Sequence, residues 1–127
     1  MKKFLAVLIL AFTTSLVTAQ NQGNTYMFTG KLISAPTSVA SCGTIAVAYA
    51  YEFEITMISD ESYTQQNIAI VVDCPDLLGA NFFKVDATYK MELFDVNGNN
   101  YSVMNLAVLD SYNLAHNYYA GDIKRLQ

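Results

Sequence analysis

Residues 44–57, with the sequence TIAVAYAYEFEITM, decide the fold because their larger apolar side chains recur at every second position. The odd positions carry Ile, Val, Tyr, Tyr, Phe, Ile and Met, whereas the even positions carry Thr, Ala, Ala, Ala, Glu, Glu and Thr. Seven consecutive matches to a period of two indicate a β-strand rather than a helix. The even face changes from alanine to glutamate midway, which predicts that its first half is covered and its second half meets water.

Four further segments alternate in the same way and predict strands at 26–33, 66–74, 88–96 and 101–109. Gly30 inside the first of them predicts a bulge or a sharp bend. Pro75 ends the third strand because proline cannot donate to the ladder. Asn97 and Gly98 favour a hairpin turn between the last two strands, since Asn and Gly tolerate positive φ.

Two segments are less regular. Residues 76–83 predict a short helical turn. The tail, residues 110–127, fits either a short helix ending at Gly121 or a sixth strand followed by a loop, and we favour the helical or irregular alternative. Five strands in this order, with a short helix or loop between the third and the fourth, predict an all-β Greek-key barrel of the oligonucleotide/oligosaccharide-binding (OB) type. A β-sandwich is the alternative.

The N-terminus reads as a secretory signal peptide. Lys2 and Lys3 precede an apolar run at 4–12, and small residues lead to Ala19, so cleavage is expected between Ala19 and Gln20. Residues 20–127 then form one domain with five basic and eleven acidic side chains, a net charge of −6. We therefore expect a secreted or periplasmic protein that is soluble, with no membrane insertion after cleavage.

Export changes the meaning of the two cysteines, Cys42 and Cys74. An even count in an oxidising compartment favours a disulfide. Closing a loop of this length stabilises a fold by roughly 3–4 kcal/mol in the chain-entropy model. A zinc site needs more ligands than these cysteines and His116 supply, so no metal and no cofactor are expected.

Several groups of residues could form a functional site, but a structural role is the favoured explanation for each of them. Glu52 and Glu54 lie on one strand face at a spacing not far from that of the paired carboxylates in a carboxylate-dependent hydrolase, but a solvated strand face is the favoured explanation. The segment 95–99 has a faint likeness to a calcium loop, but glycine comes too early and no closing Glu follows. His116, whose nearest serine is Ser111, lacks the partners of a catalytic base.

The remaining features bear on partners. A net charge of −6 opposes phosphate, so nucleic-acid binding is not expected. Asn100 opens an N-glycosylation sequence, which requires a host that performs the modification. Tyr112, Tyr118 and Tyr119 are the candidate binding residues, because tyrosine suits recognition surfaces, although packing at the barrel end also accounts for them. These observations favour a non-enzymatic binding or accessory module that recognises a protein or a glycan.

Four stretches carry a resemblance to known proteins: 30–33 (GKLI), 42–43 (CG), 72–75 (VDCP) and 83–89 (FKVDATY). Together they resemble small secreted OB-like proteins of bacteria. More distantly the layout is similar to netrin-type modules, which include the tissue inhibitors of metalloproteinases, and this likeness implies a protease inhibitor as a further alternative. The reactive N-terminal cysteine of those inhibitors has no counterpart here, so no functional residue is carried over from them.

Overall fold

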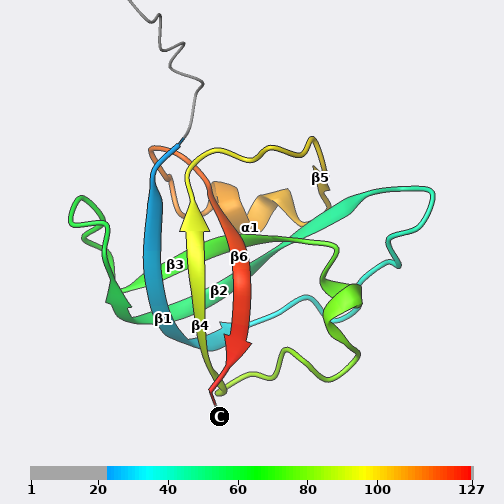
Figure 1. Ribbon diagram of the computed structural model, residues 1–127, viewed down its shortest axis with the longest axis horizontal. Coiled ribbons are helices and arrows are strands. Elements are labelled where there is room, and N and C mark those ends of the chain that lie inside the picture. The colour runs from blue at the N-terminus through cyan, green and yellow to red at the C-terminus, as the bar shows by residue number, and fades with distance from the viewer. Residues whose placement is uncertain (1–22, 127) are drawn as a thin grey trace, which may run out of the picture.

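The computed structural model describes residues 23–126, so the predicted signal peptide lies outside the described residues (Figure 1). The elements in chain order are β1 (Thr25–Ser34), β2 (Val47–Ile58), β3 (Asn67–Asp73), the 3₁₀-helix η1 (Pro75–Leu78), β4 (Thr88–Phe94), β5 (Ser102–Val103), α1 (Leu106–Asp110) and β6 (Tyr118–Arg125). Among the described residues, no helix has the length and apolar character needed to cross a bilayer.

Five of the strands close into a barrel. The hydrogen-bonded order is β1-β4-β6-β3-β2, and a further pairing between β1 and β2 closes the circle. The contact between β3 and β6 is parallel, and the other four contacts around the barrel are antiparallel. If the five barrel strands β1, β2, β3, β4 and β6 are numbered 1 to 5 along the chain, their order around the barrel is 1-2-3-5-4. This arrangement, with η1 after the third strand, confirms the predicted Greek-key barrel of OB type.

β1 closes the barrel because it pairs on both edges, and it bends to do so. Its register against β2 shifts between Thr29 and Gly30, which confirms the predicted irregularity at this glycine. A Cβ atom at Gly30 would lie 2.5 Å from the Phe28 ring and 2.7 Å from the Glu54 carbonyl oxygen. Only glycine therefore lets the two strand backbones approach this closely.

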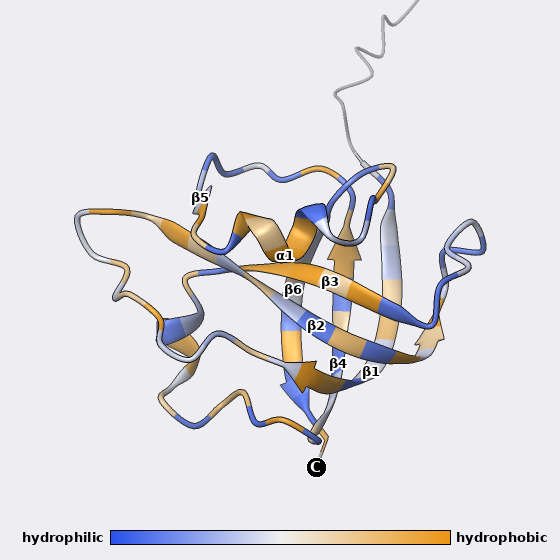
Figure 2. Cartoon of the chain, turned by 180° about the vertical axis from the view of Figure 1, so that it is seen from behind, coloured by the Kyte–Doolittle hydropathy of each residue, from blue (hydrophilic) through white to orange (hydrophobic). Residues whose placement is uncertain are grey.

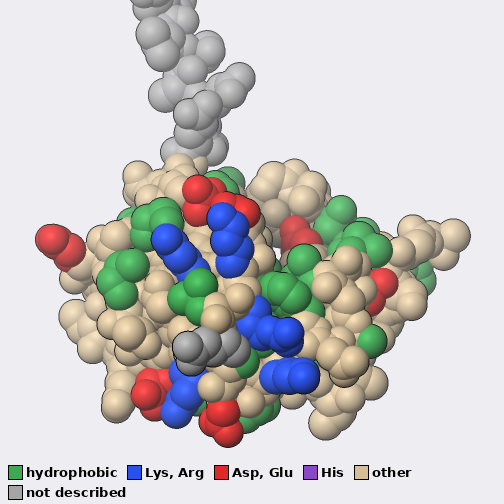
Figure 3. All heavy atoms as spheres, turned by 60° about the horizontal axis from the view of Figure 1, so that its bottom comes forward, with side chains coloured by type: hydrophobic (Ala, Val, Ile, Leu, Met, Phe, Trp, Pro, Cys, Tyr) green, Lys and Arg blue, Asp and Glu red, His purple; other side chains and the backbone are tan. Residues whose placement is uncertain are grey.

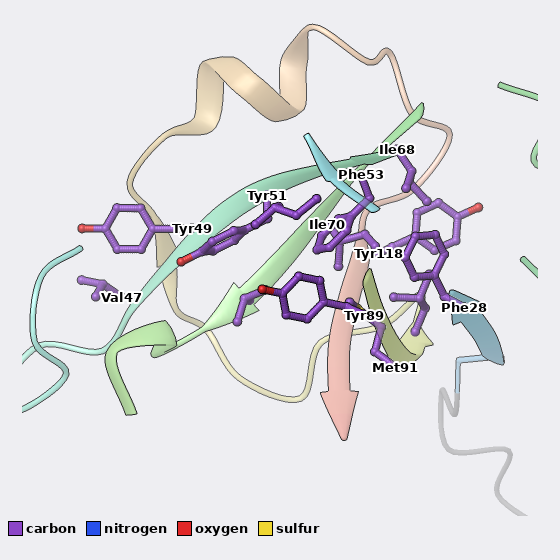
Figure 4. Packing of buried hydrophobic residues seen from close by; sticks show 13 residues of the cluster. Phe28, Val47, Tyr49, Tyr51, Phe53, Ile68, Ile70, Tyr89, Met91 and Tyr118 are labelled. Atoms are coloured by element: carbon purple, nitrogen blue, oxygen red, sulfur yellow. The ribbon is translucent and has the colours of Figure 1, made fainter. Parts of the chain in front are cut away.

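The two faces of β2 confirm the interpretation of its alternating sequence. Figure 4 shows its odd side chains, among them Tyr51 and Phe53, packed in the barrel interior against Phe28 and Tyr89. On its even face, Ala48 and Ala50 are buried in a second apolar cluster with Leu109 of α1. Glu54, farther along the same face, is exposed. Figure 2 shows the corresponding change along the ribbon of β2, from apolar to hydrophilic residues.

The prediction for residues 101–109 was wrong. Only Ser102–Val103 is a strand, and it pairs in parallel with β2 instead of returning along β4. Leu106–Asp110 is helical and lies on the outer face of β2 and β3. The last barrel strand is β6, which pairs antiparallel with β4, so the preference for a helical or irregular tail was also wrong. The loop at Asn97 and Gly98 thus connects β4 to β5, which pairs with β2, and forms no hairpin.

The other boundaries differ by a few residues. β2 begins at Val47 and not at Thr44, so Ile45 is exposed instead of buried in the core. β4 ends at Phe94, and the helical turn is confined to Pro75–Leu78. β3 is buried on both faces, because α1 covers Ala69 and Val71 while the barrel interior takes up the alternate residues.

Candidate functional site

A hollow of about 400 Å³ opens beside the C-terminal end of β1. One wall is the segment that follows β1, the other is η1 with the loop after it, and β2 contributes the floor. Its lining residues are Ala35, Pro36, Thr37, Ser38, Val39, Tyr51, Pro75, Asp76, Gly79, Ala80 and Phe83. We call it the clasp pocket, because a disulfide ties its two walls together.

That disulfide joins Cys42, in the loop after β1, to Cys74, at the start of η1, and it confirms the predicted bridge. The Cα atoms are 5.5 Å apart, and 32 positions separate the two residues along the chain. Cys74 has a left-handed backbone with φ of 46°, which turns the chain from β3 into η1. The Cys42 N–H also donates to Oδ2 of Asp76 at 3.1 Å. A covalent bond and a hydrogen bond thus hold Asp76 against the opposite wall.

The floor of the clasp pocket is aromatic. The rings of Tyr51 and Phe83 are 4.2 Å apart between centroids, with their planes inclined by 33°. Phe83 is half-buried and meets the hollow, whereas only 3% of Tyr51 is exposed. Tyr89 supports them from below, because its hydroxyl donates to the Phe82 carbonyl at 2.7 Å and accepts from the Lys84 N–H at 2.7 Å. The loop that carries Phe83 is therefore held on both sides of that residue.

Two polar residues that line the clasp pocket have unused hydrogen-bonding capacity within the described part of the chain. Oδ1 of Asp76 is buried and has no partner, while Oδ2 is used by Cys42. The hydroxyl of Tyr51 makes no hydrogen bond with a described residue. Burial, followed by the neighbouring Tyr49 and Tyr89, raises the pKa of Tyr51, so its hydroxyl stays protonated. The clasp pocket thus offers one acceptor and one donor beside an apolar ring.

A second hollow, of about 310 Å³, lies on the other side of residues 35–38. Glu52 and Asn105 line it, but Glu54 does not. The Asn105 amide is already committed, since it accepts from the Ala50 N–H at 2.7 Å and donates to the Ala50 carbonyl at 2.8 Å. Glu52 accepts from the Tyr112 hydroxyl at 2.9 Å. The structure therefore does not bring Glu52 and Glu54 together around one hollow.

The chain itself covers much of the surface that OB barrels commonly use for ligands, which is the outer face of the second and third strands. Here β5 pairs with β2, and Leu109 of α1 packs on Ala48 and Ala69. The two hollows described above lie at the rim of the barrel, on either side of the loop after β1.

The three tyrosines predicted as binding residues do not form one exposed surface. Tyr118 is 3% exposed, and its hydroxyl donates to Oδ2 of Asp60 at 2.6 Å in the barrel interior. Tyr112 and Tyr119 pack against the second apolar cluster under α1. Tyr118 and Tyr119, adjacent on β6, point to opposite sides of the sheet, and a binding role for these tyrosines stays a prediction.

The remaining candidates also lie apart from the hollows. His116 packs its ring on Tyr118, with 4.8 Å between centroids, and the hydroxyl of Ser111 donates to the Val108 carbonyl. Asp95 accepts from the Asn24 side chain at 3.3 Å. Within residues 23–126, no three His, Cys, Asp or Glu side chains come close enough together to hold a metal ion. Asn100 is exposed.

Sequence reasoning missed Asp76 and Phe83. Both lie in the segment expected to form a helical turn, and an available signal was the aromatic pair Phe82-Phe83. Their relation to Tyr51 and to the loop after β1 is a product of the tertiary fold. Comparisons of the chain with known protein families, with curated proteins and with solved structures gave no match.

Proposed function

We propose that this chain is a secreted or periplasmic binding module, without catalysis, that recognises a glycan in the clasp pocket. The observation that carries the proposal is the half-buried Phe83 ring in a hollow that the Asp76 carboxylate also lines. A sugar ring has an apolar C–H face and a rim of hydroxyl groups. The aromatic ring suits the C–H face, and the carboxylate accepts hydrogen bonds from the hydroxyls.

The size and the construction of the clasp pocket support this proposal. Its volume of about 400 Å³ falls in the range of small-molecule sites and admits one or two sugar units. The disulfide and the Cys42–Asp76 hydrogen bond hold the walls in place before a ligand arrives, which reduces the entropic cost of binding. The disulfide also fits an oxidising compartment outside the cytosol.

The alternatives draw less support from the geometry. A hydrolase using Glu52 and Glu54 would require both carboxylates to flank one cleft, and only Glu52 lines a hollow. A netrin-like inhibitor would require a reactive group at the mature N-terminus, for which the sequence offers no cysteine. Recognition of a protein surface remains the other outcome for a non-catalytic module.

Saturation-transfer NMR tests the proposal with the methyl glycosides of glucose, galactose, mannose and N-acetylglucosamine as probes. We expect transfer from the protein to the C–H protons of at least one sugar. The signal should disappear in Phe83→Ala, and affinity should fall about three- to tenfold in Asp76→Asn and in Tyr51→Phe, the cost of one hydrogen bond.

Matched controls separate a lost contact from a lost fold. Asp122→Asn removes an exposed carboxylate on β6, and Tyr26→Phe removes a hydroxyl near the N-terminal end of β1, away from the clasp pocket. Both should bind as the parent does. The proposal fails if no probe receives saturation, or if Phe83→Ala and the two controls bind equally well.

A further inference from the structure

The positive charges of the described chain gather at one end of the barrel, although the protein is acidic overall. Figure 3 shows this end, with the lysine and arginine side chains close together. The register of the strands explains the grouping: Lys90 of β4 lies directly opposite Lys124 of β6, and Arg125 lies opposite Tyr89. On the other edge of β4, Thr88 pairs with Lys31 of β1. All five cationic side chains of residues 23–126 belong to this group, namely Lys31, Lys84, Lys90, Lys124 and Arg125.

These cations have few anionic partners. The one ion pair within 4.0 Å in the described part of the chain joins Lys124 to Asp122 at 3.8 Å. Arg125 donates to the carbonyl oxygens of Asn81 and Phe82, which orients it without neutralising its charge. Four acidic residues lie near the group by sequence and register, namely Glu54, which pairs with Lys31, and Glu92, Asp86 and Asp122, and the other seven lie elsewhere. Lys90 and Lys124 carry like charges and face each other, and their repulsion destabilises the fold.

Apolar side chains are exposed beside the cations. Val85, next to Lys84, is 52% exposed, and Leu126, next to Arg125, is also 52% exposed. The two segments meet at this end of the barrel, because the Leu126 N–H donates to the Thr88 carbonyl at 2.8 Å. Aliphatic side chains surrounded by Lys and Arg suit the boundary between acyl chains and anionic headgroups. Base stacking would require exposed aromatic side chains, and none of the exposed large apolar residues within residues 23–126 is aromatic.

We propose that this end of the barrel, which we call the basic end, docks on an anionic lipid surface. Lys31, Lys84, Lys90, Lys124 and Arg125 face the headgroups, and Val85 and Leu126 reach the interfacial region. The acidic remainder of the molecule is repelled by the same surface, so that the charge distribution orients the protein. The association is peripheral and leaves the clasp pocket to act independently.

Vesicle co-sedimentation tests this proposal. The exported protein is used, and its intact mass confirms that residues 1–19 are absent, because that apolar segment would itself bind lipid. We expect binding to phosphatidylcholine vesicles that contain about 30% phosphatidylglycerol, and little binding to pure phosphatidylcholine. Each basic residue near the surface contributes about fivefold in affinity, so Lys90→Gln with Lys124→Gln should weaken binding about 25-fold.

A second variant distinguishes weaker vesicle binding from a folding defect in the sheet. Lys84→Gln with Val85→Ser lies in a loop and should also weaken binding at least about fivefold. Asp110→Asn, an exposed neutralisation at the end of α1, is the control and should bind as the parent does. Circular dichroism confirms that each variant is folded.

Three outcomes would overturn the inference. The first is equal sedimentation with neutral and anionic vesicles, and the second is no sedimentation with anionic vesicles at low salt. The third is capture by inorganic polyphosphate without vesicle binding, which would identify a soluble polyanion as the partner. None of these outcomes bears on sugar binding, so the two proposals stand or fall separately.

Discussion

Replacing Tyr118 with phenylalanine tests whether a buried hydrogen bond to a charged group holds β6 to the β2–β3 connection. Asp60 is 6% exposed and follows β2, and its Oδ2 accepts from the Tyr118 hydroxyl at 2.6 Å. Its Oδ1 accepts from the hydroxyl and the N–H of Ser62 at 2.5 and 3.0 Å. The carboxylate therefore joins the β2–β3 connection to β6, which are far apart in sequence.

The expected magnitude follows from the charge on Asp60. Burial acts to raise the pKa of Asp60, but hydrogen bonds from Ser62 and Tyr118, together with the nearby His116, bring it below its ordinary 3.8. The side chain is thus ionised at neutral pH, and a hydrogen bond to a charged group contributes about 1.5–3 kcal/mol. This contribution is complete above the ordinary pKa and is lost as the pH falls through the lower pKa of the folded state. The cost of Tyr118→Phe should therefore shrink in acid.

Urea unfolding followed by circular dichroism measures this difference at about pH 7 and about pH 3. The matched control is Tyr26→Phe, because the Tyr26 ring packs on Tyr118 at 6.1 Å but its hydroxyl makes no hydrogen bond with a described residue. We expect the control to lose less than about 0.5 kcal/mol at both pH values. An equal loss in the two variants, or a Tyr118→Phe loss that does not change with pH, would refute the reasoning.

Three further perturbations follow from the packing. Gly30→Ala should cost about 1–3 kcal/mol in urea unfolding, because its Cβ would meet Phe28 and the Glu54 carbonyl, whereas Gly43→Ala, with open space around it, should cost less than about 0.5 kcal/mol. Phe53→Ala should lower the free energy of unfolding by about 3–5 kcal/mol, since this ring is fully buried; a loss below about 1 kcal/mol would contradict its central place in the core. Removing the disulfide with paired Cys→Ser changes should cost about 3–4 kcal/mol, and free thiols in the native exported protein would show that the bridge does not form.

The sequence predicted local structure well where side-chain chemistry alone decides it. Alternation marked β1, β2, β3 and β4, and the alanines at positions 48 and 50 correctly indicated a covered face. What covers them was not predictable, because Leu106 and Leu109 fit a helical turn as well as a strand. Small side chains on β2 and β3 leave room for a helix, and this packing decided between the alternatives.

The hairpin prediction failed for a related reason. Asn97 and Gly98 indicate that the chain reverses, but turn chemistry is local and does not specify which strand lies beside β4. In the folded protein β6 lies beside β4, and Leu93 of β4 pairs with Ala120 of β6. The clasp pocket was equally unpredictable from the sequence, because Phe83 and Tyr51 come into contact only in the closed barrel.

The sequence by itself determined the segments that form β1, β2, β3 and β4, the bend at Gly30 and the pairing of Cys42 with Cys74, because each depends on side-chain periodicity, backbone sterics or the parity of cysteines. Only the tertiary structure decided the last barrel strand, the cover over β2 and the groups that meet at the clasp pocket and the basic end. These features depend on contacts between residues distant along the chain, and the competing arrangements satisfy the same local preferences.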